Sequence, residues 1–136
     1  MSQSNGGDLS NYYQQIEENG RLQTTEIAQQ WSTAVLRALG TNLDGRTKKR
    51  LAKTLPDELA FDLKRKFWLL HFRDKNKPRD AFLKEVARMG GNTDAKFALF
   101  PTRAVFHELK GYAGKEVSDD VAESLPIEVG ELWQKA

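Results

Sequence analysis

Twelve cationic side chains lie between residues 46 and 79, and these side chains are suited to binding an anionic partner. They are Arg46, Lys48, Lys49, Arg50, Lys53, Lys64, Arg65, Lys66, Arg73, Lys75, Lys77 and Arg79. Only four acidic residues interrupt them, so this stretch carries a net charge of +8, while residues 1–45 and 80–136 each carry −3. Lysine and arginine bind carboxylates and phosphates through charge-assisted hydrogen bonds. This basic block is the predicted partner-binding site.

The spacing of the first cations indicates that they share one helical face. Arg46, Lys49, Arg50 and Lys53 are three and four residues apart, which brings side chains together on a helix. We expect the partner to be an acidic protein surface, because the acidic flanks disfavour wrapping a polyanion around the whole molecule. Nucleic acid and the anionic surface of a membrane remain alternatives. A solvated helix face that binds nothing explains the same cations equally well.

Residues suited to catalysis are few. The sequence has no cysteine, which excludes thiol nucleophiles, thiolate metal sites and disulfides. His71 and His107 are the only histidines, and neither has a second ligand at helical spacing. Glu58 and Glu128 each follow a proline and suit the start of a helix. We therefore expect no enzyme, metal or cofactor; a site in a groove between the two halves of the chain, using these four residues, is the alternative.

The elements that must position these side chains come from an internal duplication with a shift of 70 residues. Residues 12–66 align with 82–136 without a gap, and nine positions are identical. In the first half these are Gly20, Ala28, Ala34, Val35, Leu39, Ala52, Leu55, Pro56 and Glu58. The other matched positions are mostly apolar in both halves. The pattern predicts two similar repeats.

Apolar residues at spacings of three and four predict that each repeat has four helices. The first covers roughly residues 9–18, and its equivalent includes Phe82 to Val86. The expected start signals of the others are Thr24, Asp44-Gly45 and Pro56 in the first repeat, and Asp94, Ser118 and Pro126 in the second. Gly40 is expected to stop the second helix. The inward face of the fourth helix is expected to carry Leu59, Leu63, Phe67 and Leu70. Pro101 is expected to kink or split the sixth helix, which should have Phe97 on its inward face.

The expected fold is therefore all-α, with two four-helix repeats packed into one compact domain. We expect a flexible tail at 1–8 and a single domain at 9–136, divided into repeat one (9–72), a linker (73–78) and repeat two (79–136). No apolar run is long enough to cross a membrane and the N-terminus does not resemble a signal peptide. The sequence therefore predicts a soluble cytoplasmic protein.

The pattern of the two halves resembles domain-of-unknown-function family 2267, an uncharacterised bacterial family. An aromatic-led helix, a capped helix, a short helix and a Leu-Pro-x-Glu turn follow one another in each half. They are Tyr12–Ile16, Ile27–Leu39, Leu51–Leu55 with Pro56 and Glu58, and their copies Phe82–Val86, Phe97–Leu109, Val121–Leu125 with Pro126 and Glu128. The resemblance covers about residues 10–135. It implies an all-helical domain of two repeats and carries no activity with it.

Overall fold

The computed structural model describes residues 9–65, 74–91 and 94–136, and in these residues the chain is helical without strands. The expectation of a compact all-α fold is confirmed. The elements are α1 (Ser10–Asn19), α2 (Thr25–Thr41), α3 (Gly45–Thr54), α4 (Asp57–Lys64), α5 (Arg79–Met89), a 3₁₀ turn η3 (Ala95–Ala98), α6 (Leu99–Ser124) and α7 (Ile127–Lys135). No described helix is long and apolar enough to span a bilayer.

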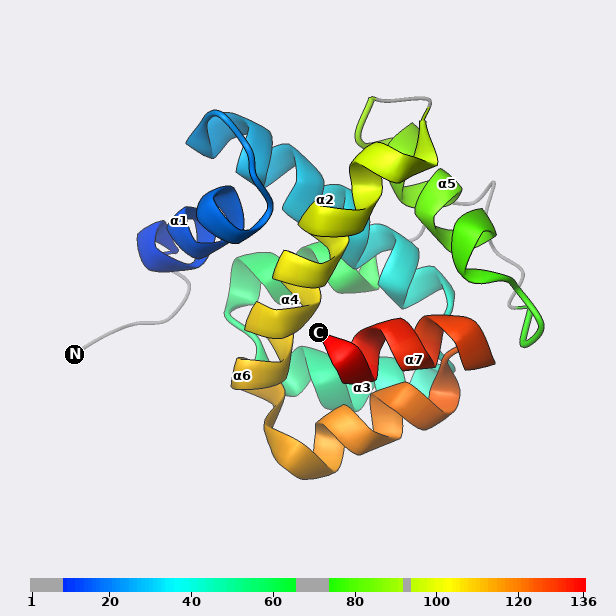
Figure 1. Ribbon diagram of the computed structural model, residues 1–136. Helices are drawn as coiled ribbons and strands as arrows, with labels where there is room; N and C mark the ends of the chain where they lie inside the picture. Colours follow the sequence, from blue (N-terminus) through cyan, green and yellow to red (C-terminus); the bar gives the residue numbers. More distant parts are fainter. Residues whose placement is uncertain (1–8, 66–73, 92–93) are drawn as a thin grey trace.

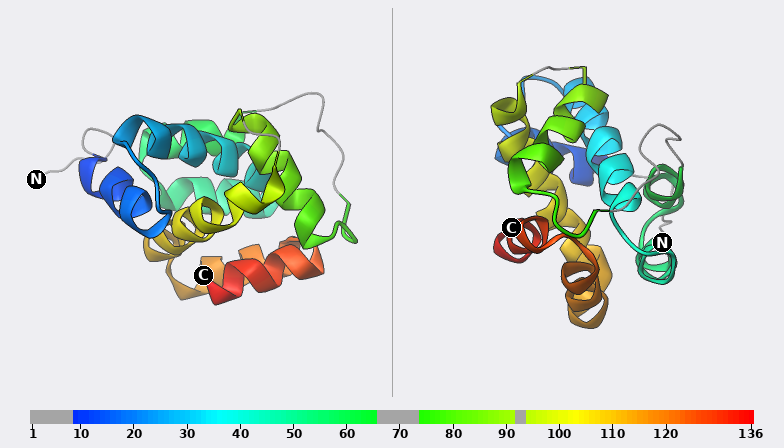
Figure 2. Two further views of the ribbon diagram at one scale, coloured as in Figure 1. Left: turned by 45° about the horizontal axis from the view of Figure 1, so that its top comes forward. Right: turned by 90° about the vertical axis from the view of Figure 1, so that its right-hand side faces the viewer.

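The long helix α6 runs through the middle of the fold and contacts both halves of the chain (Figure 1). Its first part packs against α1 and α2, and the helix also packs against α3 and α7. In the right-hand view of Figure 2, α3 and α4 lie along one edge, while α5 and α7 lie toward the opposite edge. The side chains exposed by α3 and α4 are therefore on a different part of the surface from those exposed by α5 and α7.

The core forms because each helix buries one apolar stripe. On α2, the residues from Ala28 through Leu39 that recur at helical spacing are buried, as the sequence predicts. Phe106 packs between two other buried rings, with its ring centroid 6.0 Å from that of Phe82 and 5.1 Å from that of Trp133. All three side chains are fully buried.

Two glycines allow helix ends to approach the opposite half of the chain. A Cβ added to Gly20 would lie 3.3 Å from the Cα of Pro101, and one added to Gly90 would lie 3.2 Å from the Trp31 ring. Under the 70-residue shift, Gly20 is equivalent to Gly90 and Trp31 to Pro101, so the two contacts are reciprocal. Their correspondence is what a duplication would produce, although the duplication itself stays a prediction.

Gly40 has a different role from the expected one. It does not stop α2, which continues to Thr41. A Cβ at Gly40 would instead overlap the carbonyl oxygen of Leu63 on α4. The missing side chain therefore lets α2 and α4 pack closely, and the prediction that Gly40 ends the helix is wrong.

The second half differs from the prediction at Ser118. This residue does not cap a separate helix, because it lies inside α6. The break occurs at Gly114, whose φ of 78° and ψ of 169° favour glycine strongly. Ser118 instead accepts hydrogen bonds from the Trp133 indole Nε1 at its carbonyl oxygen and its hydroxyl, both at 3.0 Å. In the described residues α6 is thus two helical segments that meet at Gly114, so the second half keeps four helical segments, and the third begins after Gly114 rather than at Ser118.

The sixth helix was expected to be kinked or split at Pro101, and it is split just before that residue: η3 ends at Ala98 and α6 begins at Leu99. Pro101 therefore lies in the first turn, where a missing N–H costs no hydrogen bond. Phe97 is 57% exposed, so its expected inward position is wrong. Because η3 has about three residues per turn, the apolar periodicity of α6 does not extend back through it.

Candidate basic interface

The described part of the basic block begins on α3, which is held by a cap and by its apolar face. The Asp44 side chain accepts a hydrogen bond from the Thr47 N–H at 2.7 Å and starts the helix. Leu51 and Ala52 are buried. The opposite face carries Arg46, Lys49 and Lys53, which are all exposed.

Arg50 shares this helix but is engaged within the fold. Its guanidinium pairs with the Asp120 carboxylate on α6, and Glu116 lies 3.7 Å away. Close by, the Ser124 hydroxyl accepts from the Asp44 N–H at 2.9 Å and donates to the Asp44 carboxylate at 3.0 Å. These contacts attach α3 to the last turns of α6. Arg50 therefore contributes less positive charge to a partner than its position in the sequence suggests.

Two cations of the predicted linker also serve the fold. The Lys75 Nζ donates to the carbonyl oxygens of Glu123, Ser124 and Leu125, at 3.0, 3.4 and 3.5 Å. These carbonyls lie at the C-terminus of α6, where a cation complements the negative end of the helix dipole.

Lys77 forms an ion pair and is less exposed than Arg50, another cation of the basic block with an ion pair among the described residues. Lys77 pairs with Glu85, and the two side chains are only 11% and 15% exposed. The Asn42 amide Nδ2 donates to the same Glu85 carboxylate at 3.4 Å. Lys77 therefore links the chain before α5 to α5 itself and is poorly placed to meet a partner.

The remaining cations are distributed unevenly. Lys64 and Arg65, at the end of α4, are exposed, as is Arg79 at the start of α5. Arg79 also donates its backbone N–H to the Glu128 carboxylate at 2.8 Å. Lys48 is half-buried. Lys66 and Arg73 lie outside the described residues, as do Phe67, Leu70 and His71. The structure thus separates the cations that are engaged within the fold, Arg50, Lys75 and Lys77, from an exposed set that is smaller than the whole block.

A comparison with protein families matches residues 10–132 to the conserved, uncharacterized family DUF2267. The chain belongs to the DUF2267 family. The match covers nearly the whole chain, and the resemblance noted from the sequence is confirmed at the level of the family. No curated protein matches it.

An exposed aromatic residue that was not recognised from the sequence lies among the cations of this DUF2267 chain. Phe61 on α4 is 62% exposed. Lys64 and Arg65 follow it at three and four residues and therefore project from the same side of the helix. The buried residues Leu59 and Leu63 fix the opposite side. The sequence contains a signal for this position. Phe61 is two residues from both Leu59 and Leu63, so a helix that buries the two leucines turns Phe61 away from the core.

The residues considered for catalysis are not brought together in this DUF2267 chain. Glu58 accepts from the Tyr13 hydroxyl at 3.5 Å, whereas Glu128 accepts from the backbone N–H of Arg79. The His107 Nδ1 lies 2.9 Å from the Ala136 oxygen. In the described ranges no group of three or more histidine and acidic side chains could hold a metal ion. The three described candidates therefore act at separate places.

A tyrosine and carboxylate cluster lies where α1 meets α2 and α4. The hydroxyls of Tyr12 and Ser32 share a buried hydrogen bond of 2.7 Å. Burial, together with the negative charges of Glu58 and Asp62, raises the pKa of Tyr13 to about 12. Burial also raises the pKa of Asp62, although the hydrogen bond from Thr33, at 3.3 Å, opposes this. The cluster holds helices together by neutral hydroxyl groups.

Proposed function

We propose that this chain is a non-enzymatic interaction protein that binds an acidic surface of a protein partner. The binding site is the exposed set on α3 and at the end of α4, here called the α3–α4 surface. It comprises Arg46, Lys49, Lys53, Phe61, Lys64 and Arg65. The observation that carries the proposal is an exposed phenylalanine with cations on the same helical face.

The composition of the α3–α4 surface suits a protein interface. Phe61 offers apolar area that becomes buried against a partner, and aromatic residues are enriched where binding energy concentrates. Lys64 and Arg65 offer charge-assisted hydrogen bonds next to it. Since α3 and α4 pack against each other, the cations of α3 lie on the helix next to Phe61. An acidic patch with an apolar recess is the complementary surface.

The acidic residues of α6 favour a protein over a long polyanion. The cations of α3 and the acids of α6 occupy equivalent positions under the 70-residue shift: Arg46 and Glu116, Lys49 and Asp119, Arg50 and Asp120, Lys53 and Glu123. Because α3 packs against α6, negative charge borders the positive face. A nucleic acid that extends past α3 meets repulsion there. A protein partner can match both signs.

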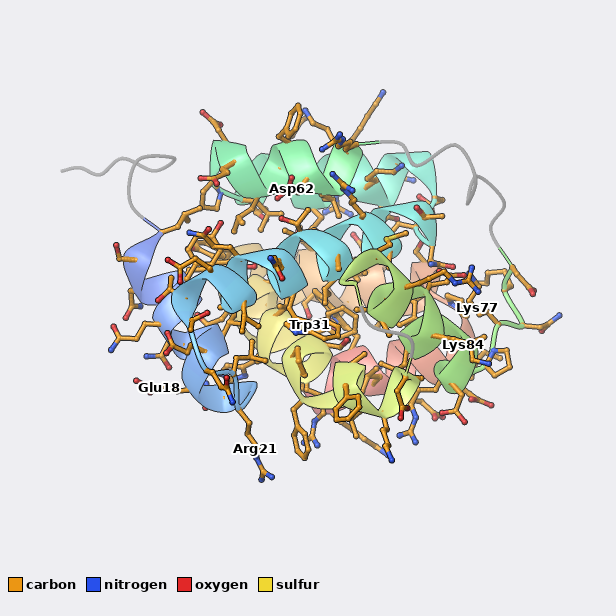
Figure 3. All side chains as sticks on the ribbon, turned by 90° about the horizontal axis from the view of Figure 1, so that it is seen from above. Glu18, Arg21, Trp31, Asp62, Lys77 and Lys84 are labelled. Atoms are coloured by element: carbon orange, nitrogen blue, oxygen red, sulfur yellow. The ribbon has the colours of Figure 1, made fainter. Side chains whose placement is uncertain are left out.

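Site-specific photocrosslinking tests the proposal. A photoreactive phenylalanine analogue replaces Phe61 or Lys53, and the control position is Lys84 on α5, well separated from Asp62 on α4 in Figure 3. We expect one protein to crosslink at both sites on the α3–α4 surface and not at Lys84. That protein, once purified, should bind the unmodified chain with an affinity that falls as salt is raised.

Charge reversal completes the test. Lys49→Glu with Lys53→Glu should weaken binding of the purified partner by at least about tenfold, which corresponds to ~1.4 kcal/mol. Lys84→Glu and Arg88→Glu, which alter the net charge equally on another exposed helix, should leave it unchanged. Equal weakening by both pairs would mean that only net charge matters and would contradict the proposal. Sedimentation of the chain alone shows whether the partner is a second copy.

Nucleic-acid binding through the same surface is the second candidate, and Phe61 favours it. An exposed ring among cations can stack on an unpaired base. Titration with duplex and single-stranded DNA and RNA at low and high salt tests this. Phe61→Ala should then weaken only single-strand binding, whereas Lys49→Glu with Lys53→Glu should weaken both. No binding at low salt would dismiss the candidate.

A further inference from the structure

A cavity at the other side of the fold has a lining suited to an anionic ligand. It measures about 460 Å³ and is bounded by α1, α6 and the last residue of the sequence. Its lining consists of Asn19, Arg21, Phe100, Arg103, Ala104, His107 and Ala136. Two guanidinium groups, one imidazole and one phenyl ring are present, and no lining side chain is acidic. The imidazole is engaged, because the His107 Nδ1 lies 2.9 Å from the backbone oxygen of Ala136, so the two arginines are the groups left for an anion. The neighbouring cavity shares Arg103 but is balanced by Asp80, Glu128 and Glu131.

The backbone at Arg21 is the second observation. Arg21 has a φ of 59°, the single positive φ outside glycine among the described residues. Side chains with a Cβ adopt this left-handed region at a cost in free energy. The equivalent residue under the 70-residue shift is Gly91, with a φ of 84°. The same turn is thus formed with glycine in one half and with arginine in the other, where glycine would be more stable.

The position of Arg21 is fixed by close packing on α6. Gly20 approaches the backbone of Pro101, which brings the end of α1 against the first turn of α6. The Arg21 guanidinium carbon then lies 4.2 Å from the centre of the Phe100 ring, within range of a cation–π interaction. Figure 3 shows Arg21 reaching outward from the end of α1. A costly backbone conformation therefore places a cation at the edge of the cavity.

The lining groups together match a phosphate attached to a planar ring. Arginine forms two parallel hydrogen bonds with phosphate, and two arginines can share its charge. Phenyl and guanidinium groups both offer flat faces on which a base can stack. The cavity volume falls in the range of small-molecule sites, roughly 300–1,000 Å³. We propose that this cavity binds a mononucleotide, with Arg21 and Arg103 on the phosphate and Phe100 against the base.

Calorimetric titration with ADP, adenosine and inorganic phosphate tests the proposal. ADP should bind more tightly than adenosine or phosphate alone, because each of these lacks one half of the recognised chemistry. Arg21→Gly should weaken ADP binding by at least about tenfold, or ~1.4 kcal/mol. The same variant should melt no lower than the unchanged chain. That combination separates a binding role from a structural one.

Two further variants keep the test independent of Arg21. Arg103→Gln, on an exposed position of α6, should also weaken ADP binding, while Lys49→Glu on the α3–α4 surface should leave it unchanged. The proposal is overturned if ADP binds no tighter than phosphate. It is also overturned if ADP binds the Arg21→Gly and Arg103→Gln variants as tightly as it binds the unchanged chain. Binding of a single-stranded oligonucleotide without any binding of ADP overturns it too. Neither result bears on the proposed protein partner, whose site is separate.

Discussion

Arg50 and Asp120 form an ion pair across the packing of α3 against α6, although they occupy equivalent positions 70 residues apart. A residue that meets its own equivalent would face an identical side chain in two identical repeats. Two arginines or two aspartates there would repel each other. Opposite charges at this position therefore allow the two halves to pack closely, and they make the halves chemically different.

Exchanging the two charges tests this relationship. Arg50→Asp alone brings a third carboxylate toward Asp120 and Glu116 and should lower the free energy of unfolding by about 1 kcal/mol, since both paired side chains are about one-third exposed. Adding Asp120→Arg should recover most of the loss. Urea denaturation of the two single variants and the double variant gives the coupling. Purely additive effects would show that the pair contributes nothing.

Gly40 and Gly111 should respond to alanine in opposite directions. Gly40→Ala places a methyl group on the Leu63 carbonyl and forces α2 and α4 apart, at a cost of about 1–3 kcal/mol. Gly111 lies inside α6 with open space around it, so Gly111→Ala should stabilise the protein by roughly 0.5–1 kcal/mol. Thermal denaturation distinguishes the two. A destabilised Gly111→Ala protein would contradict the geometry of α6.

The tyrosines predict a loss of stability at alkaline pH. Burial raises the pKa of Tyr13 to about 12, whereas an unfolded tyrosine titrates near ~10. The folded state therefore keeps its proton longer, and this contribution, complete below pH ~10, is lost as pH rises to about 12. Tyr13→Phe should flatten the stability profile in this window. Burial also raises the pKa of Tyr12 and Tyr112.

Absorbance and denaturation measured together check this prediction. Tyrosinate absorbance of the native chain should stay low near pH ~10 and rise as the protein unfolds. At neutral pH the slope of stability with pH should be the same with and without Tyr13→Phe, which serves as the control. Tyrosinate formation near pH ~10 in a still folded protein would show that the rings are more accessible than the structure has them.

The pair of Lys77 and Glu85 should be coupled more strongly than that of Arg50 and Asp120, because it is less exposed. Lys77→Met removes the cation that faces the Glu85 carboxylate, keeps its hydrogen bond from the Asn42 amide, and should destabilise by about 2–3 kcal/mol. Lys77→Met combined with Glu85→Leu should cost less than Lys77→Met alone. A double-variant cycle in urea measures the difference. If the double variant is the least stable of the three, the pair is not the source of the effect.

Local signals were the part of the fold that could be predicted. Thr24 caps α2 by accepting from the Ile27 N–H at 3.1 Å, and α4 and α7 begin directly after Pro56 and Pro126, as expected. These features depend on neighbouring residues alone. The prediction that Ser118 caps a helix was wrong. A serine before an apolar run suits a cap, but the chain already bends at Gly114, so Ser118 lies inside the helical segment that follows.

The candidate site could be predicted only in part, because which cations stay exposed depends on tertiary contacts. Nothing near Lys75 in the sequence indicates that it meets the carbonyls at the end of α6, some fifty residues away. Arg50 likewise finds Asp120 only after α3 and α6 pack. The strained backbone at Arg21 has no signal in the residue itself, since arginine is not expected in a left-handed turn; only its alignment with Gly91 points to one.

The central position of α6 sets the order in which the protein can be built on the ribosome. Helix α1 is synthesised first, but it packs against α6 as well as α2. Tyr12 and Ile16, fully buried in the finished fold, therefore lack part of their cover until residues beyond 99 have been translated. The N-terminal half emerges as an incomplete core. Its apolar surface is open to molecular chaperones until the last third of the chain leaves the exit tunnel.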